Sequence, residues 1–94
     1  MAGCTVRKVE TRDRAQWDAL YAGYADFYGV AQSVDMRDRV WAWLHDDAHE
    51  SIGLVAEGAD GQLLGLAHIR PFARPLTATT VCFLDDLFVD PDSR

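Results

Sequence analysis

The sequence predicts an α+β fold of the order β-α-α-β-β-β, with two helices placed before an antiparallel meander. Three observations support this prediction: apolar residues at helical spacing after residue 13, an Asp-Gly turn signal at 60–61, and strand-like runs on either side of that turn. The length of 94 residues allows one domain, 1–94. The expected elements are strand 5–10, helix 14–28, helix 35–45 and strands 51–57, 62–70 and 79–89.

The composition excludes several classes of partner. The net charge is −6, whereas nucleic acids and anionic membranes both select basic surfaces. The longest apolar runs are only a few residues long, so no transmembrane helix is expected. The N-terminus has no signal-peptide pattern, and Cys4 and Cys82 have neither metal nor disulfide spacing. We therefore expect a cytoplasmic protein with two reduced thiols.

The first helix has an aromatic stripe and a clear start and stop. Asp13 is a candidate N-cap with Gln16 as its capping-box partner, and Gly29 ends the pattern. The residues on one face are Trp17, Leu20, Tyr21, Tyr24, Phe27 and Tyr28. Most stripes at this spacing pack in a core, which we expect for Phe27. The roles of Tyr24 and Tyr28 stay open between packing and a binding site.

The second helix is expected to start at a Ser33 or Asp35 cap and to bury one apolar face. The residues that share this face are Met36, Val40, Trp43 and Leu44. Arg37 lies off this face, and Trp41 also lies away from it, where it can cover a neighbouring loop.

The returning strand of the hairpin contains Pro71, which should lie near its end because proline cannot donate to a strand ladder. His68 in the same strand is expected to be hydrogen-bonded within the sheet, with a place facing a binding cleft as the alternative. His45 and His49 are four residues apart without an obvious third ligand, so we expect solvated side chains and no metal.

The last strand, CFLDDLFV, is apolar on both faces except for two adjacent aspartates. Side chains alternate between the faces of a regular strand, so Asp85 and Asp86 should point in opposite directions. A buried ionised carboxylate is costly unless it has a partner. Both residues therefore require a cleft, hydrogen-bond donors or raised pKa values.

Three stretches resemble the N-terminal half of the GNAT superfamily, the Gcn5-related N-acetyltransferases. They are TVRKVETRDRAQWDALYAGYADFYGV, GLVAEGADGQLLGLAHIRP and, most specifically, CFLDDLFVDPDSR. Together they cover essentially the whole chain. The resemblance implies an acyl-CoA N-acyltransferase fold and transfer of an acetyl group from acetyl-CoA to a small primary amine.

The resemblance also implies where the donor binds. In the family, the strand matching 79–89 carries a β-bulge and parts from the next strand, leaving room for the pantetheine arm of acetyl-CoA. The main-chain groups that bond this arm correspond to Leu87, Phe88 and Val89, and the N–H of Leu87 is placed to meet the oxyanion. Arg94 corresponds to the start of the glycine-rich loop that cradles the pyrophosphate.

For the acceptor side, the resemblance implies a base and a binding wall. Asp85 matches a carboxylate that takes a proton from the substrate ammonium, directly or through water. Asp86, Tyr24 and Tyr28 match the region that holds the amine. A structural hydrogen bond is the competing interpretation for Asp86, and pairing with an arginine is a general alternative for either aspartate.

The sequence stops before the glycine-rich loop, so we expect a truncated chain that is inactive alone. The alternative is a non-catalytic interaction module that dimerises or swaps through the exposed edge of its last strand. No particular amine is singled out by the residues.

Overall fold

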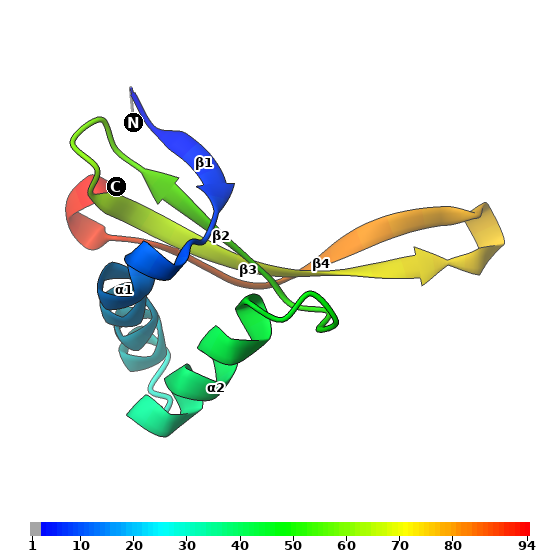
Figure 1. Cartoon of the computed structure of the whole chain (residues 1–94), viewed down its shortest axis with the longest axis horizontal. Coiled ribbons are helices and arrows are strands. Elements are labelled where there is room, and N and C mark those ends of the chain that lie inside the picture. Colours follow the sequence, from blue (N-terminus) through cyan, green and yellow to red (C-terminus); the bar gives the residue numbers. More distant parts are fainter. Residues whose placement is uncertain (1–2) are drawn as a thin grey trace.

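The computed structural model describes residues 3–94 as a four-stranded antiparallel sheet with both helices on one face (Figure 1). The sheet order is β1-β2-β3-β4, and the α+β fold class is confirmed. The strands are β1 (Thr5–Lys8), β2 (Ile52–Glu57), β3 (Leu63–Arg74) and β4 (Thr79–Val89), the helices are α1 (Arg14–Phe27) and α2 (Val34–Leu44), and short 3-10 turns cover Thr11–Asp13, Pro75–Thr77 and Pro91–Ser93. Within the described residues, neither helix is long and apolar enough to cross a bilayer.

The core lies between α1 and the sheet. Trp17 and Leu20 of α1 pack with Val55, Leu66 and Phe88 from the three strands β2, β3 and β4. The Trp17 side chain is 0% exposed, so the aromatic stripe of α1 is a packing stripe at this end.

The other end of the stripe differs from the prediction. Phe27 is 68% exposed and contacts Tyr28 edge-on, with ring centroids 5.1 Å apart, so the expectation of a packed Phe27 is wrong. Phe27 belongs to a flank of α1 that overhangs β4, and β4 is the last strand in the sheet order. Among the described residues, no further strand is present to cover this flank.

The buried face of α2 is rotated from the predicted one. It consists of the buried Arg37 and the half-buried Val40, Trp41 and Leu44, whereas Met36 and Trp43 are exposed. Trp41 packs against Trp17 with ring centroids 4.9 Å apart instead of covering a loop. The error has a physical cause: Arg37 is buried because its Nε donates to Oδ1 of Asp18 at 2.9 Å, and hydropathy alone does not indicate a paired arginine.

The helix caps resolve one open alternative and correct one expectation. Ser33 caps α2, since its Oγ accepts the N–H of Met36 at 3.1 Å. Asp13 precedes α1 but makes no side-chain cap bond. Its carboxylate instead accepts two bonds from Arg7 at 2.7 and 2.9 Å, and Gln16 accepts the N–H of Leu63 at 2.8 Å.

β3 and β4 form a long arm, here defined as residues 70–83, that projects away from the rest of the molecule (Figure 1). β2 stops pairing at Ile52 opposite Ile69, whereas β3 and β4 stay paired out to Arg74 and Thr79. β3 therefore continues past Pro71, beyond the predicted end at residue 70. Proline is tolerated there because that side of β3 has lost its neighbouring strand.

Candidate functional site

A β-bulge in β4 brings both adjacent aspartates to one cleft. Asp86 lies opposite His68 and Leu84 opposite Ile69, so Asp85 is an extra residue without a partner in β3. The bulge that the family resemblance implied is thus present. A regular strand would direct these neighbours to opposite faces, but here both line a cleft of about 400 Å³ between α2, β3 and β4.

Arg70 holds the Asp85 side of the cleft. Its Nε donates to Oδ2 of Asp85 at 2.7 Å and its Nη2 donates to Oδ1 at 2.8 Å. Nη1 of Arg70 also lies 3.7 Å from Oε1 of Glu50, which lines the same cleft. This two-point geometry fixes the orientation of the Asp85 carboxylate.

Asp86 is held from the opposite side by α1 and β3. Tyr21 donates its hydroxyl to Oδ2 of Asp86 at 3.0 Å, and Nδ1 of His68 lies 2.8 Å from the same oxygen. Burial raises the pKa of Asp86, but the hydrogen bonds from His68 and Tyr21 outweigh it and leave this pKa below its ordinary value. Burial and the charge of Asp86 raise the pKa of Tyr21. Asp86 therefore stays ionised and Tyr21 protonated at neutral pH.

The two tyrosines predicted for the acceptor side lie at different depths. Tyr24 packs edge-on against Phe88 with ring centroids 6.1 Å apart, and burial followed by the charge of Asp86 raises the pKa of its hydroxyl. Tyr28 is exposed one turn later, with its ring centroid 5.0 Å from that of Tyr24. Tyr24 is thus near Asp86, whereas Tyr28 lies at the surface.

The residues predicted for the donor side divide between the two faces of β4. Phe88 points into the core, and Leu87 and Val89 face away from the helices. Nε of Arg94 donates to the carbonyl oxygen of Val89 at 2.9 Å, and the guanidinium lies 5.4 Å from the centroid of the Phe88 ring. Leu87, Val89 and Arg94 share one shallow hollow with Ser93.

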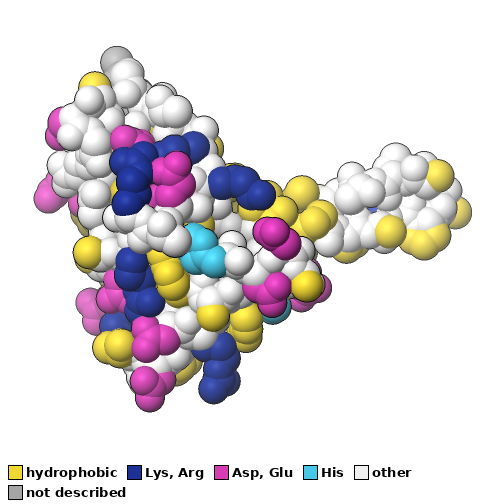
Figure 2. Space-filling view, viewed as in Figure 1, with side chains coloured by type: hydrophobic (Ala, Val, Ile, Leu, Met, Phe, Trp, Pro, Cys, Tyr) yellow, Lys and Arg dark blue, Asp and Glu magenta, His cyan; other side chains and the backbone are white. Residues whose placement is uncertain are grey.

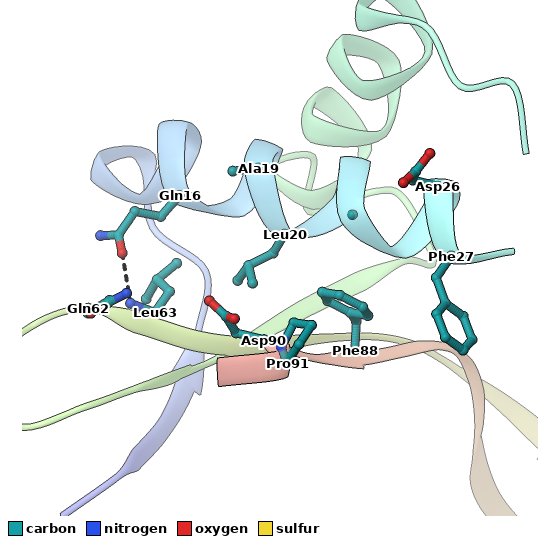
Figure 3. Close-up of a pocket in the computed structure, with 11 residues that line it drawn as sticks. Gln16, Ala19, Leu20, Asp26, Phe27, Gln62, Leu63, Phe88, Asp90 and Pro91 are labelled. Atoms are coloured by element: carbon teal, nitrogen blue, oxygen red, sulfur yellow. Dashed lines mark hydrogen bonds between the residues drawn. The ribbon is translucent and has the colours of Figure 1, made fainter. Parts of the chain in front are cut away.

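A second hollow of about 530 Å³ lies under α1 at the end of β4 (Figure 3). Phe88, Asp90 and Pro91 form its floor, and Gln16 closes one end through its bond to Leu63. This hollow lies on the helix side of the sheet, two residues along β4 from Asp86. It contains none of the residues predicted for the amine.

The arm has only two charged side chains, Arg70 and Arg74. Figure 2 shows acidic and basic side chains crowded on the body of the molecule, while the arm is hydrophobic or uncharged along most of its length. Its exposed apolar side chains include Phe72, Leu76 and Phe83, and Leu76 is 95% exposed. The cleft with the two aspartates lies where the arm joins the body.

Tyr21 and Arg70 line the cleft and Trp17 lies behind it, and none of the three is predicted from the sequence as a site residue. The helical stripe indicates only packing for Tyr21 and Trp17, and no sequence pattern singles out Arg70. The signal that was available is the pairing register: once β3 and β4 are aligned antiparallel, His68 falls opposite Asp86, and Arg70 falls opposite Phe83, two residues before Asp85.

The acetyltransferase (GNAT) family model matches residues 17–94. The chain belongs to the GNAT family. Among curated relatives, an uncharacterised N-acetyltransferase, YhfO, of Bacillus subtilis (strain 168) is 28% identical over 89 residues, which are 95% of this chain and 58% of that protein. The chain thus spans less than two thirds of the length of this relative.

Solved structures have the same fold. A probable acetyltransferase superimposes with a TM-score of 0.83 at 22% identity, covering 96% of this chain and 60% of that one. A ribosomal-protein-alanine N-acetyltransferase from Brucella melitensis biovar Abortus 2308 gives 0.74 at 22% identity, with 97% and 59% covered. An aminoglycoside antibiotic 6′-N-acetyltransferase from Acinetobacter baumannii gives 0.73 at 18% identity, with 96% and 59% covered.

Proposed function

We propose that this chain is part of an N-acetyltransferase that transfers an acetyl group from acetyl-CoA to a small primary amine. Membership of the GNAT family supports the reaction class. The observation that carries the proposal is the bulge at Asp85, which aims two consecutive carboxylates into one cleft beside the edge strand β4. A cationic amine is the substrate that such a cleft favours.

The chemistry assigns a role to each carboxylate. An amine is protonated at neutral pH and must lose a proton before its nitrogen attacks a thioester carbonyl. Asp86 anchors the ammonium group, and Asp85 accepts the proton directly or through one water. The new C–N bond then forms as the C–S bond breaks, and the leaving thiolate of coenzyme A takes up a proton. The N–H of Leu87 is the proposed donor to the oxyanion.

The donor arm is proposed to lie along the outer edge of β4, where the main chain of Leu87, Phe88 and Val89 provides hydrogen-bonding groups. β4 is the last strand in the sheet order, so its outer backbone groups lack a strand partner within residues 3–94. The carbonyl of Val89 already accepts a bond from Arg94. Arg94 is therefore proposed to turn from this carbonyl toward the pyrophosphate when acetyl-CoA binds.

The acceptor is proposed to enter past Tyr24 and Tyr28 at the end of α1. Structural neighbours carry names that refer to acceptors as different as aminoglycosides and glucosamine-6-phosphate. A panel of small primary amines therefore tests the class before any single compound. The two cysteines of the chain, Cys4 and Cys82, are free, consistent with the proposed cytoplasmic location.

Calorimetry with acetyl-CoA tests the donor side directly. One-to-one binding of acetyl-CoA by the 94-residue chain is the expected result. The absence of binding heat would count against a donor site within this chain.

An interaction module is the second candidate, because the outer edge of β4 and the apolar arm are both exposed. In this alternative, two copies pair through β4. A silent titration with acetyl-CoA together with a dimer by light scattering would favour it.

A further inference from the structure

Four side chains from α1, β3 and β4 form one continuous hydrogen-bonded chain behind the cleft. Nε1 of Trp17 lies 3.0 Å from Nε2 of His68, and Nδ1 of His68 lies 2.8 Å from Oδ2 of Asp86. The hydroxyl of Tyr21 reaches the same oxygen at 3.0 Å. Trp17 is fully buried and His68 is 4% exposed, so water does not compete for these bonds.

The chemistry of the indole fixes the state of His68. An indole N–H can only donate, so Nε2 of His68 must be the acceptor and carries no proton. The proton of the neutral imidazole therefore sits on Nδ1 and is donated to Asp86. A second proton on His68 would place two N–H groups against each other in a buried site, which is strongly unfavourable.

Two side chains hold Asp86 by the same carboxylate oxygen. The bonds from His68 and Tyr21 both end on Oδ2, so Oδ1 receives neither of them. A carboxylate gripped at one oxygen cannot rotate freely, and its other oxygen keeps a fixed direction. The titratable and charged groups around it are Tyr21 and Tyr24 of α1, His68 and Arg70 of β3, Asp85 of β4, and His49 and Glu50 of the segment before β2.

We propose that Trp17 and His68 are positioning residues for the amine: Trp17 selects the Nδ1–H form of His68, and His68 in that form aims Asp86 at the ammonium group. This inference rests on the proposed function, because it assigns Asp86 to the acceptor. The proposal gives a role to the hydrogen bond between Trp17 and His68, which neither core packing nor the acetyl-transfer step requires.

Nitrogen NMR of the histidine rings in the wild-type protein tests the first link, which is the hydrogen bond from Trp17 to His68. We expect the neutral ring of His68 to carry its proton on Nδ1 and none on Nε2. A proton on Nε2 would overturn the proposal.

A matched pair of variants tests the second link. His68→Asn keeps an N–H donor near the Nδ1 position, whereas His68→Leu keeps similar bulk without a donor. Carboxyl carbon NMR of Asp86 should show that His68→Leu raises the pKa of Asp86, with a smaller change in His68→Asn. Trp17→Phe, which keeps an aromatic ring and removes the indole donor together with part of the side-chain volume, provides a further variant should His68→Leu not fold. It should allow the Nε2–H form of the His68 ring to appear in the nitrogen spectrum, and a ring that stays entirely in the Nδ1–H form would contradict the first link.

Steady-state kinetics test whether the orientation of Asp86 by His68 affects binding of the amine. His68→Leu should raise the KM for the amine about tenfold, and His68→Asn should recover most of that loss. An unchanged KM in His68→Leu, in spite of a raised pKa of Asp86, would refute the positioning role. If the NMR results hold but no amine is acetylated, the proposed function fails while the hydrogen-bonded chain itself stands.

Discussion

Arg70 grips Asp85 at both carboxylate oxygens, at 2.7 and 2.8 Å, from the strand position beside the β4 bulge. The neighbouring aspartate is held instead by neutral donors, Tyr21 and His68. Two adjacent residues of one strand therefore have different electrostatic partners. In the proposed function, Asp85 accepts the proton and Asp86 anchors the ammonium group.

Asp85→Asn should lower kcat/KM for an amine mainly at low pH. Free amine is scarce there, so the proton acceptor matters most, and the expected loss is about 100-fold near pH 6. Asp26→Asn removes the same charge from an exposed position of α1 and is the matched control. A pH profile that keeps its shape in Asp85→Asn would rule out the base assignment.

Arg70→Gln should lower the KM for the amine, because it removes a cation from the cleft that receives an ammonium group. The urea midpoint should change little, since exposed ion pairs contribute little to stability. Arg74→Gln, farther out on the same strand, makes the same charge change away from the cleft. An amine KM that rises in Arg70→Gln but not in Arg74→Gln would indicate that Arg70 itself binds the acceptor.

Asp13→Asn should destabilise the fold by about 2 kcal/mol at pH 7, because Asp13 is 2% exposed and accepts both bonds from Arg7. Hydrogen bonding to Arg7 is the main cause that holds the pKa of Asp13 below its ordinary value of 3.8. A lowered pKa stabilises the fold above 3.8, and this contribution is lost as the pH falls through the native value. Urea denaturation should therefore show the difference from wild type narrowing below that pH, and a constant difference would contradict it.

Gly65→Ala should cost about 2 kcal/mol and weaken acetyl-CoA binding. A Cβ at Gly65 would lie 2.7 Å from the main-chain oxygen of Phe88, so β4 would have to shift where the donor arm is proposed to lie. Gly58→Ala is the control, since its Cβ would lie 3.2 Å from the Asp60 side chain, which can move, and at an ordinary contact distance of 3.5 Å from the main-chain oxygen of Gln62 and from Leu64. Equal losses of stability in the two variants would show that the close approach to β4 is not responsible.

Amide hydrogen exchange should be faster in the arm than in β2. Both faces of the arm are exposed, and an isolated two-stranded ribbon is only marginally stable in water. Deuterium uptake measured by mass spectrometry should be rapid over 71–83 and slow over 52–57. Strong protection of the arm in dilute solution would mean that another surface covers it, and dilution would then reveal a second copy.

The sequence pattern was sufficient for the element order, because turn signals and periodicity are local. The pattern also predicted the packed end of α1, because helical periodicity is a local signal. It was not sufficient for α2, where the ion pair between Arg37 and Asp18 buries a charged side chain that hydropathy assigns to solvent. The predicted end of β3 at residue 70 was wrong because the effect of Pro71 depends on where β2 stops.

The candidate site was predictable only in part. Adjacent aspartates in an apolar strand indicate a special environment, and the family resemblance implied the bulge. The partners of these aspartates depend on register, since a shift of one residue would remove both His68 and Arg70 from their positions. The bond from Trp17 to His68 joins residues 51 positions apart, and local sequence carries no signal for it.

The sheet order β1-β2-β3-β4 also has a kinetic consequence. The β2–β3 and β3–β4 pairings join neighbouring segments through short turns, whereas β1 pairs with β2 only after two intervening helices. Closing a long loop costs more conformational entropy than closing a short one, which slows it. We therefore expect the hairpins to assemble early and β1 to dock late. Arg7 lies on β1 and contacts both Asp13 and Glu57, so this final docking also completes the ion-pair cluster.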